Sequence, residues 1–491
     1  MEIKISIPER IIKDLVGFLK SLPFAKMVVI MASVMAVLAT AYSFFNHLII
    51  AYGDAESHLN IAKRVVSSLT PGFAQLGGIW LPLPHLLMVP FVIFDPLWRT
   101  GLAGSIVSGI CFIVASFFIY KLTLLITNNK YASFLASLVF ITNINILYMQ
   151  STPMTELPLI AFMTLTTYYF VLYLRDNTFN SLLIAAFWGF CASLSRYDGW
   201  FIVLTEVLII FLHRFPYKRF WENIKARGLT LFPFLSERGE GEMIIFSTLA
   251  LIGIVAWFVW GFVILGDPLY FTNSQFSAKS QQHGFLVRGE LPAFKNFPLS
   301  FLYYSVTSMS SVGIIIFAIA IVGLVVFSLD KKVKDKLLIL LLFMSPFIFY
   351  VVTLYLGQSV IFIPDLTPVS FEWRLFNVRY GLVMVPAIAI LVGYLFSKIK
   401  NFGKILLITL IIANMGLYVI GYTRVLALED GLIGLSHSSH PDAEFWLRAH
   451  YDNGLAILDD YARTMSIIGS GIPMQNIVYV EIGRASCRER V

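Results

Sequence analysis

Charged residues are scarce in this chain of 491 residues. Only 13% of the residues are Asp, Glu, Lys or Arg, whereas 58% are hydrophobic, and the mean hydropathy is +0.79. A soluble protein carries roughly a quarter charged residues. The scarcity excludes an ordinary soluble domain, and the repeated apolar runs of about 18 residues or more predict a polytopic, all-α membrane protein.

Cysteines and phosphate-binding glycine loops are also lacking. Cys111 and Cys191 lie in apolar runs and Cys487 lies near the end of the chain, so no disulfide framework follows. No Gly-rich phosphate loop or dinucleotide-binding pattern occurs. We expect no cleavable signal peptide; residues 1–26 form an amphipathic basic lead-in to a first span that serves as an uncleaved anchor.

The apolar runs predict about eleven transmembrane helices. Their expected ranges are 27–50, 102–126, 131–150, 153–174, 181–195, 199–213, 243–265, 300–327, 337–356, 380–397 and 404–423. Together they make residues 27–423 the membrane domain.

The net charge of +7 indicates membrane topology rather than nucleic-acid binding, because Lys and Arg are unevenly placed. They are dense in the loops 213–228, 330–336 and 398–404 and sparser in the loops 51–101, 266–299, 357–379 and after about 424. The positive-inside rule therefore puts the N-terminus and the dense loops in the cytoplasm. The sparser loops face outward from the cell membrane.

The C-terminal part has a different composition. Residues 424–480 have the polarity of a soluble protein, with a predicted helix near 442–450 and a strand-like run at 455–458. We expect a small extracytoplasmic α/β segment that is cut short. The final residues 481–491, EIGRASCRERV, read as a translated sequencing adapter and are excluded from the prediction of the fold.

The first outer loop holds the densest early cluster of ionisable groups. The run DAESHLNIAKRVV predicts an amphipathic helix on the membrane surface, with Asp54, Glu56 and His58 at its start. A simple explanation for Asp54 is a helix cap worth about 1 kcal/mol. The next run, TPGFAQLGGIWLPLPH, ends at His85 and is too irregular for a span and too apolar for a solvated loop. It is typical of re-entrant backbone lining a cavity.

Further ionisable groups lie at the outer ends of later spans. STPMTELPL places Glu156 between two prolines, and an ionisable group there indicates either function or a rim carboxylate that reaches water. SRYDGW places Arg196 and Asp198 in a turn, where a structural ion pair is the simpler explanation. Glu206 lies within a span, where we expect only a buried hydrogen bond.

Two more outer loops carry polar and cationic groups. GDPLYFTNSQFSAKSQQHG offers Tyr270 and Lys279, and FEWRLFNVRYGLVMVP offers Arg374 and Arg379. Arginine is well suited to bidentate binding of phosphate, although Arg379 alone is also explained by snorkelling to the interface. Transporters place ionisable sites at the membrane midplane, whereas here the charges converge on the outer ends of the spans.

One chemistry that needs a carboxylate, cationic phosphate binders and a lipid-accessible cavity is sugar transfer from a lipid-phosphate carrier. The carboxylate takes the proton of an acceptor hydroxyl, which attacks the anomeric carbon from the face opposite the phosphate. Cationic side chains then stabilise the departing phosphate.

The motifs GDAESHLNIAKRV, GGIWLPLPH, MTELPL, SRYDGW, GDPLYFTNSQFSA and NVRYGLVMVP occur in this order. In order and outer-face placement they resemble the polytopic glycosyltransferases of the C superfamily (GT-C), family 39-like. These enzymes are related to protein O-mannosyltransferases and lipid A aminoarabinose transferases. The resemblance covers roughly 27–425.

The resemblance implies an inverting transfer from a polyprenyl- or dolichyl-phosphate sugar. It implies that Asp54 is the catalytic base, that Glu156 is the family's acidic residue after the third span, and that Arg379 meets the carrier phosphate. Glu56, His58, His85, Arg196, Asp198, Tyr270, Lys279 and Arg374 are the other candidate substrate-binding residues. One departure concerns Glu56, since Ala55 separates it from Asp54 where relatives have adjacent acids, and the two would point differently on a helix.

A divalent metal remains open. Asp54, His58, His85 and Glu156 are suitable ligand types, but no tight spacing supports a site, so we expect no obligatory metal. The expected partners are a lipid-linked sugar donor, a hydroxyl-bearing acceptor (protein, lipid or glycan) and the bilayer, with no nucleic acid. The alternatives are a lipid or glycolipid transporter, which needs internal repeats and midplane polar sites, and a structural subunit of a larger complex.

Overall fold

The structure is a computed structural model that describes residues 23–214, 237–371, 374–438, 441–458 and 466–479. Most of the predicted basic lead-in, most of the loop 213–228 and the adapter-like residues 481–491 lie outside the described residues.

Six helices in the described part are long and apolar enough to cross a membrane, which makes this a multi-pass membrane protein. They are α2 (Phe24–Phe45), α6 (Leu102–Thr127), α9 (Glu156–Asp176), α13 (Glu237–Leu265), α18 (Lys336–Tyr355) and α21 (Asn401–Val419). Helix α9 is the most enclosed of these six, because its most apolar stretch is 89% buried. This helix is therefore surrounded mainly by protein.

The remaining apolar segments are shorter or bent. Two pairs of helices are bent at a short break, as in a broken span or a re-entrant loop: α7 (Lys130–Ile141) with α8 (Ile144–Gln150), bent by 63°, and α16 (Phe297–Val312) with α17 (Ile314–Leu329), bent by 114°. The shorter helices are α10 (Phe179–Ser193), α11 (Tyr197–Arg214), α19 (Arg379–Leu382) and α20 (Val385–Lys398). The segments lie where hydropathy predicts spans, but the count of eleven stays a prediction.

The predicted span over 300–327 is broken in the structure rather than continuous. Gly313 adopts φ +88°, which favours glycine, and it breaks the helix there. The Asn414 side chain donates a 3.0 Å hydrogen bond to the Val312 carbonyl, which the break leaves without its helical partner. A polar side chain from a neighbouring helix thus stabilises a bend that hydropathy alone does not indicate.

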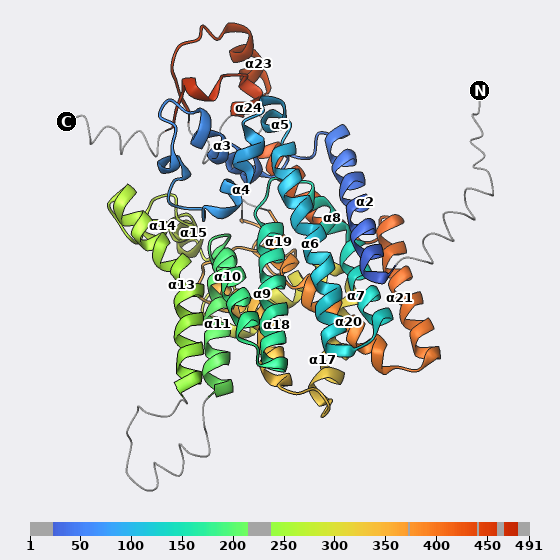
Figure 1. Cartoon of the computed structure of the whole chain (residues 1–491). Coiled ribbons are helices and arrows are strands. Elements are labelled where there is room, and N and C mark those ends of the chain that lie inside the picture. Colours follow the sequence, from blue (N-terminus) through green and yellow to red (C-terminus); the bar gives the residue numbers. More distant parts are fainter. Residues whose placement is uncertain (1–22, 215–236, 372–373, 439–440, 459–465, 480–491) are drawn as a thin grey trace, which may run out of the picture.

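The short elements gather at one end of the bundle. These are α3 (Gly53–Ser67), η1 (Phe73–Leu76), α4 (Leu83–Val92), α5 (Asp95–Arg99), α14 (Tyr270–Asn273), α15 (Ala278–Val287), α22 (Leu426–Ser438), α23 (Pro441–His450), α24 (Ile467–Ser470) and η2 (Met474–Asn476). Figure 1 shows α3, α4, α5, α23 and α24 together at this end, and the connection after α17 at the other. Strands β1 (Ala456–Leu458) and β2 (Ile477–Tyr479) pair in parallel, with Ala456 opposite Ile477.

Helix α3 differs from the expected surface helix. All of its residues from Ala55 to Val65 are buried, on the polar face as well as the apolar one. The C-terminal segment covers it: the Glu56 carboxylate accepts hydrogen bonds from Ser466 Oγ (2.7 Å) and the Ile468 N–H (2.9 Å). The Glu56 carboxylate on this face is therefore bound by protein rather than by water or lipid head groups.

Candidate active site

Asp54 and Arg379 form an ion pair at the end of the bundle where α3 and α19 lie. Asp54 lies in the first turn of α3, whose N-cap residue is Tyr52, so Asp54 is not the cap. Its Oδ2 accepts a 2.6 Å hydrogen bond from Nη1 of Arg379, the first residue of α19. The side chain of Asp54 keeps 36% of its surface exposed and that of Arg379 keeps 16%. The pair therefore borders a space that a ligand can reach.

The charge state of Asp54 follows from this contact. Burial acts to raise the pKa of the carboxyl, but the positive charge and hydrogen bond of Arg379 outweigh it and hold the pKa below its ordinary value. Asp54 is consequently ionised at neutral pH. Only Oδ2 is engaged by Arg379, which leaves Oδ1 as an acceptor for an incoming hydroxyl.

Aromatic rings flank the Arg379 guanidinium. Its carbon lies 5.9 Å from the ring centre of Tyr52 and 5.4 Å from that of Tyr380, within the range of cation–π attraction. Its Nε is buried and has no hydrogen-bond partner among the described residues. A guanidinium presents five N–H donors in a planar fork, so Arg379 retains donors for an anionic ligand while it holds Asp54.

A second ionic cluster surrounds Arg196, in the turn between α10 and α11. Arg196 Nη1 donates to Glu156 Oε1 at 2.8 Å and to Thr155 Oγ1 at 3.0 Å, while its Nε donates to Asp198 Oδ1 at 3.3 Å. The expected ion pair between Arg196 and Asp198 is confirmed. Tyr350, from α18, donates its hydroxyl to Asp198 Oδ2 at 2.7 Å.

Glu156 is fully buried at the start of α9. One oxygen binds Arg196, and the other, Oε2, has no hydrogen-bond partner among the described residues. The prediction of a rim carboxylate that reaches water is therefore wrong for Glu156. A buried acceptor without a partner costs stability, so this oxygen marks a place for a ligand or water donor.

Two buried histidines lie beside Asp54. His58 Nδ1 and His85 Nε2, from α3 and α4, are 2.9 Å apart and share a hydrogen bond, and the Trp80 ring centre lies 5.0 Å from that of His58. His58 follows Asp54 by four residues, which places both on one face of α3. Burial lowers the pKa of His58 to about 4 against the opposing effect of Asp54, and it also lowers the pKa of His85. Both rings are neutral at neutral pH.

The four possible metal ligands do not assemble. No three His, Cys, Asp or Glu side chains in the described part of the chain are placed to hold a metal ion. Asp54 and Glu156 each bind an arginine instead, and the two histidines bind each other. In this arrangement the four residues do not fit a metal site.

The other predicted residues lie elsewhere. Glu56 binds the C-terminal segment with both oxygens. Tyr270 lies on α14, where its ring packs against Gly78 of the irregular loop before α4. Lys279 and Arg374 have exposed side chains. Their roles in binding substrate stay predictions.

Sequence reasoning missed Tyr350 and Asp430. Tyr350 sits in an apolar run whose pattern indicates only a buried helix. Asp430, on α22, accepts hydrogen bonds from the backbone N–H groups just before Arg379. The only signal for it was an acid directly before a glycine in the predicted outer segment.

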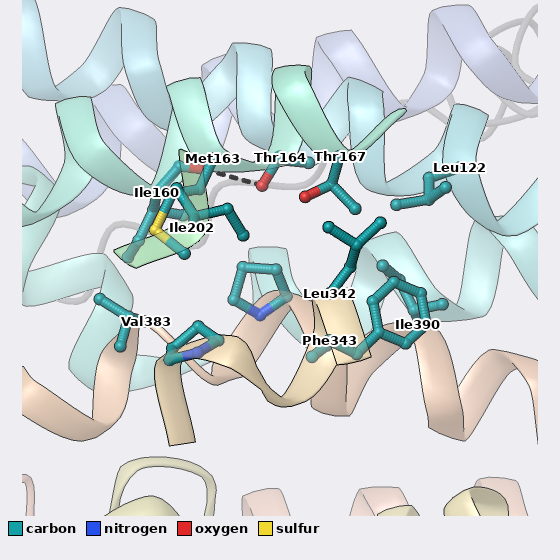
Figure 2. Close-up of a pocket in the computed structure, with 13 residues that line it drawn as sticks. Leu122, Ile160, Met163, Thr164, Thr167, Ile202, Leu342, Phe343, Val383 and Ile390 are labelled. Atoms are coloured by element: carbon teal, nitrogen blue, oxygen red, sulfur yellow. Dashed lines mark hydrogen bonds between the residues drawn. The ribbon is translucent and has the colours of Figure 1, made fainter. Parts of the chain in front are cut away.

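An apolar cavity is lined by residues of α6, α9, α11, α18 and α20 (Figure 2). Four residues of the site lie one helical turn, or four positions, from a residue of the cavity lining. The pairs are Glu156 and Ile160, Asp198 and Ile202, Arg379 and Val383, and Tyr350 and Pro346. The polar side chains in its lining are Thr164 and Thr167, and the Thr164 hydroxyl donates to the Ile160 carbonyl. The charged groups and the apolar cavity are therefore neighbours along the same helices.

The chain is similar to enzymes of known structure. It aligns with ArnT from Cupriavidus metallidurans bound to undecaprenyl phosphate at a TM-score of 0.55 and 12% identity, over 93% of this chain and 88% of that one. The chain has the GT-C fold. The same ArnT in the apo state aligns at a TM-score of 0.51, 11% identity and the same coverage. The resemblance inferred from the motifs is thereby confirmed.

Two further comparisons bear on the GT-C fold. The apo oligosaccharyltransferase from Archaeoglobus fulgidus aligns at a TM-score of 0.52 and 13% identity over 92% of this chain, which spans 64% of the length of that enzyme. Residues 91–236 match the family model described as dolichyl-phosphate-mannose-protein mannosyltransferase. No curated protein sequence matches the chain. The matched range contains the Arg196 cluster, whereas Asp54 and Arg379 lie outside it.

Proposed function

We propose that this protein is a membrane glycosyltransferase that moves a sugar from a polyprenyl- or dolichyl-phosphate carrier to an acceptor hydroxyl, with inversion. The observation that carries the proposal is the Asp54–Arg379 pair at 2.6 Å, partly open and bordered by a second buried arginine cluster. One group is a base for a hydroxyl and the other is a donor for a phosphate, and they lie side by side.

In the proposed reaction, the acceptor hydroxyl donates a hydrogen bond to Asp54 Oδ1. Its oxygen forms the new bond to the anomeric carbon while its proton passes to Asp54, and the bond between that carbon and the phosphate oxygen breaks. The carrier phosphate leaves with the electron pair, and Arg379 stabilises its negative charge. Attack opposite to the leaving group inverts the anomeric centre.

The ion pair also explains how Asp54 becomes a better base. Paired with Arg379, the carboxylate is ionised but weakly basic, since its pKa is held low. A carrier phosphate competes for the Arg379 donors, which weakens their hold on Asp54 and raises its basicity. Binding of the sugar donor would thus activate the base at the moment when an anomeric carbon is in place for the acceptor hydroxyl to attack.

The apolar cavity supports a lipid-linked donor. A polyprenyl phosphate has a charged head and an apolar tail, and the charged groups and the apolar cavity are neighbours along the same helices at one-turn spacing. Burial of apolar surface contributes about 25 cal/mol per Å². The apolar lining around Ile160 and Val383 would suit the first isoprene unit of such a carrier (Figure 2).

We place the site on the outer face of the cell membrane, with a cytoplasmic N-terminus. The support is the distribution of Lys and Arg: residues 330–336 lie at the end of the bundle opposite to α3 and α23 (Figure 1). A lipid-phosphate donor suits this location, because no nucleotide sugar is required there.

The test uses purified protein in proteoliposomes. Dolichyl-phosphate mannose and an undecaprenyl-phosphate-linked sugar are supplied separately, and release of the free carrier phosphate is measured by mass spectrometry. Release that depends on the protein, with an acceptor extract that gains the sugar in the inverted configuration by NMR, is the expected result. Movement of the intact lipid across the vesicle without cleavage of the sugar–phosphate bond contradicts the proposal and favours a transporter.

A further inference from the structure

The turn that carries Arg379 has little local support. Asn377 adopts φ +51°, a left-handed conformation that is uncommon for residues other than glycine. Helix α19, which begins at Arg379, has only four residues. The direction of the Arg379 side chain therefore depends on contacts from elsewhere in the chain.

Asp430 supplies those contacts from α22. Its Oδ1 accepts a 2.8 Å hydrogen bond from the Phe376 N–H, and its Oδ2 accepts a 3.0 Å bond from the Val378 N–H. The two donors flank Asn377, so one carboxylate grips both sides of the left-handed residue. Both oxygens of the carboxyl group are thereby engaged by this turn.

Asp430 is itself fixed to the bundle. The Ala427 N–H, one turn earlier on α22, donates a 3.0 Å hydrogen bond to Asn145 Oδ1 of α8. Gly431 lies so close to Tyr148 of α8 that a β-carbon there would be 2.5 Å from the Tyr148 hydroxyl oxygen. The contacts run from α8 through α22 and the Asp430 carboxylate to the turn before Arg379.

The burial of Asp430 carries a cost. The residue is only 1% exposed, and burial raises the pKa of its carboxyl to about 7, although the two backbone donors and the charge of Arg379 act in the opposite direction. A buried carboxyl with no bonded cation among the described residues is a poor way to gain stability. Its use here is better explained by position than by stability.

We propose that Asp430 is a positioning residue that orients Arg379 toward Asp54 and the carrier phosphate by clamping the backbone of residues 376–378. This inference rests on the proposed glycosyltransferase function for its kinetic readout. Its structural readout is independent of any activity.

The test compares Asp430→Asn with Glu429→Gln. Asparagine keeps one acceptor oxygen, but its NH₂ group would face the other backbone N–H. One of the two hydrogen bonds to the turn is therefore lost, and the two donors repel each other. Glu429 is a control on the same helix, where it pairs with the exposed Arg424 at 3.3 Å; among the described residues it forms no hydrogen bond with residues 376–378.

Two measurements are made on the full-length protein. Hydrogen–deuterium exchange is expected to speed up by about tenfold or more at residues 375–382 in Asp430→Asn and to stay unchanged in Glu429→Gln. Release of carrier phosphate is expected to fall between ~10-fold and ~100-fold in kcat, as for a misplaced catalytic contact. Asp430→Asn is expected to add little further loss when Arg379 is already replaced by Ala, because both changes act on one contact.

Opposite results overturn the inference. Unchanged exchange at residues 375–382 in Asp430→Asn shows that no clamp exists, whatever the activity. If the losses in kcat of Asp430→Asn and Arg379→Ala multiply in the double variant, Asp430 does not act through Arg379.

A second variant is available if Asp430→Asn does not fold. Asn377→Ala removes the side-chain hydrogen bond to the Val360 carbonyl (2.8 Å) that holds the same turn, and it is expected to give the same pattern of exchange and activity. Failure of the wild-type protein to cleave any donor contradicts the proposed function but leaves the exchange result to decide the clamp.

Discussion

The carboxylate of Asp54 accepts a 2.6 Å hydrogen bond from the guanidinium of Arg379, a residue 325 positions later in the chain. Neither residue is alone unusual at the outer end of a membrane helix. Brought together beside the Arg196 cluster, they place an ionised carboxylate next to N–H donors that are suited to a phosphate. The proposed reaction depends on this contact.

Replacement of Arg379 by Ala is expected to weaken binding of the carrier. The guanidinium is the partly exposed cation beside the base, and a charge-assisted bond to phosphate is worth about 1.5–3 kcal/mol, or about 10- to 100-fold in affinity. Binding of undecaprenyl phosphate to the detergent-solubilised protein measures this by thermal shift. Arg424→Ala, which removes an exposed arginine on the same side of the bundle, is the control. Equal affinity in Arg379→Ala and wild type contradicts the assignment.

The pH dependence of turnover follows from the depressed pKa of Asp54. A base whose pKa lies below its ordinary value loses activity only as the pH falls through that low value, so kcat/KM of the wild type is expected to stay flat between about pH 5 and pH 8. In Arg379→Ala the charge that lowers the pKa is gone and burial remains, so the acid limb is expected to move to higher pH. An acid limb at the same pH in both proteins shows that Arg379 does not control Asp54.

The depressed pKa of Asp54 also makes the folding stability depend on pH. The folded-state pKa of Asp54 is depressed, so its contribution to stability is present above the ordinary carboxyl pKa and is lost as the pH falls through the folded value.

Arg196 is expected to be essential for stability. Its removal as Arg196→Ala leaves Glu156 and Asp198 buried without their common cation, and loss of one partner of a buried ion pair costs about 3–5 kcal/mol. Thermal unfolding in detergent measures the loss. Arg196→Ala combined with Glu156→Gln is expected to recover part of it, because one uncompensated charge is then removed. A single variant as stable as the wild type contradicts this prediction.

Glu56 is expected to hold the C-terminal segment rather than the substrate. Glu56→Gln replaces one acceptor with a donor, and it disrupts the bonds from Ser466 and Ile468. Limited proteolysis is expected to cleave residues 466–479 faster in Glu56→Gln, and Ser466→Ala is expected to reproduce part of the effect. Resistance equal to that of the wild type in Glu56→Gln argues that the segment is held by its apolar contacts alone.

Hydropathy predicted the membrane helices well, because an apolar run of sufficient length has few alternatives in a bilayer. The predicted span 102–126 corresponds to α6, Leu102–Thr127, and 337–356 corresponds to α18, Lys336–Tyr355. The 114° bend at Gly313 could not be predicted, because its partner Asn414 lies on a helix about a hundred residues away. Hydropathy does not indicate which helices pack together.

The site was predicted in part. Positive-inside topology places Asp54, Glu156 and Arg379 on one side of the membrane, and the resemblance to GT-C enzymes implies roles for them. The pairing of Asp54 with Arg379 and of Glu156 with Arg196 depends on tertiary packing and is not visible in the sequence. Asp430 was missed because a single acid after the last span has no pattern that distinguishes it from a solvated residue.

The most direct measurement of the central claim is carrier-phosphate release by Asp54→Asn in proteoliposomes. The substitution keeps the size of the side chain and removes the base, so the rate is expected to fall by ~10²–10⁴-fold. Folding, judged by size-exclusion chromatography and thermal unfolding, is expected to stay close to that of the wild type. Wild-type turnover in well-folded Asp54→Asn would contradict the role of Asp54 as the base and with it the proposed mechanism.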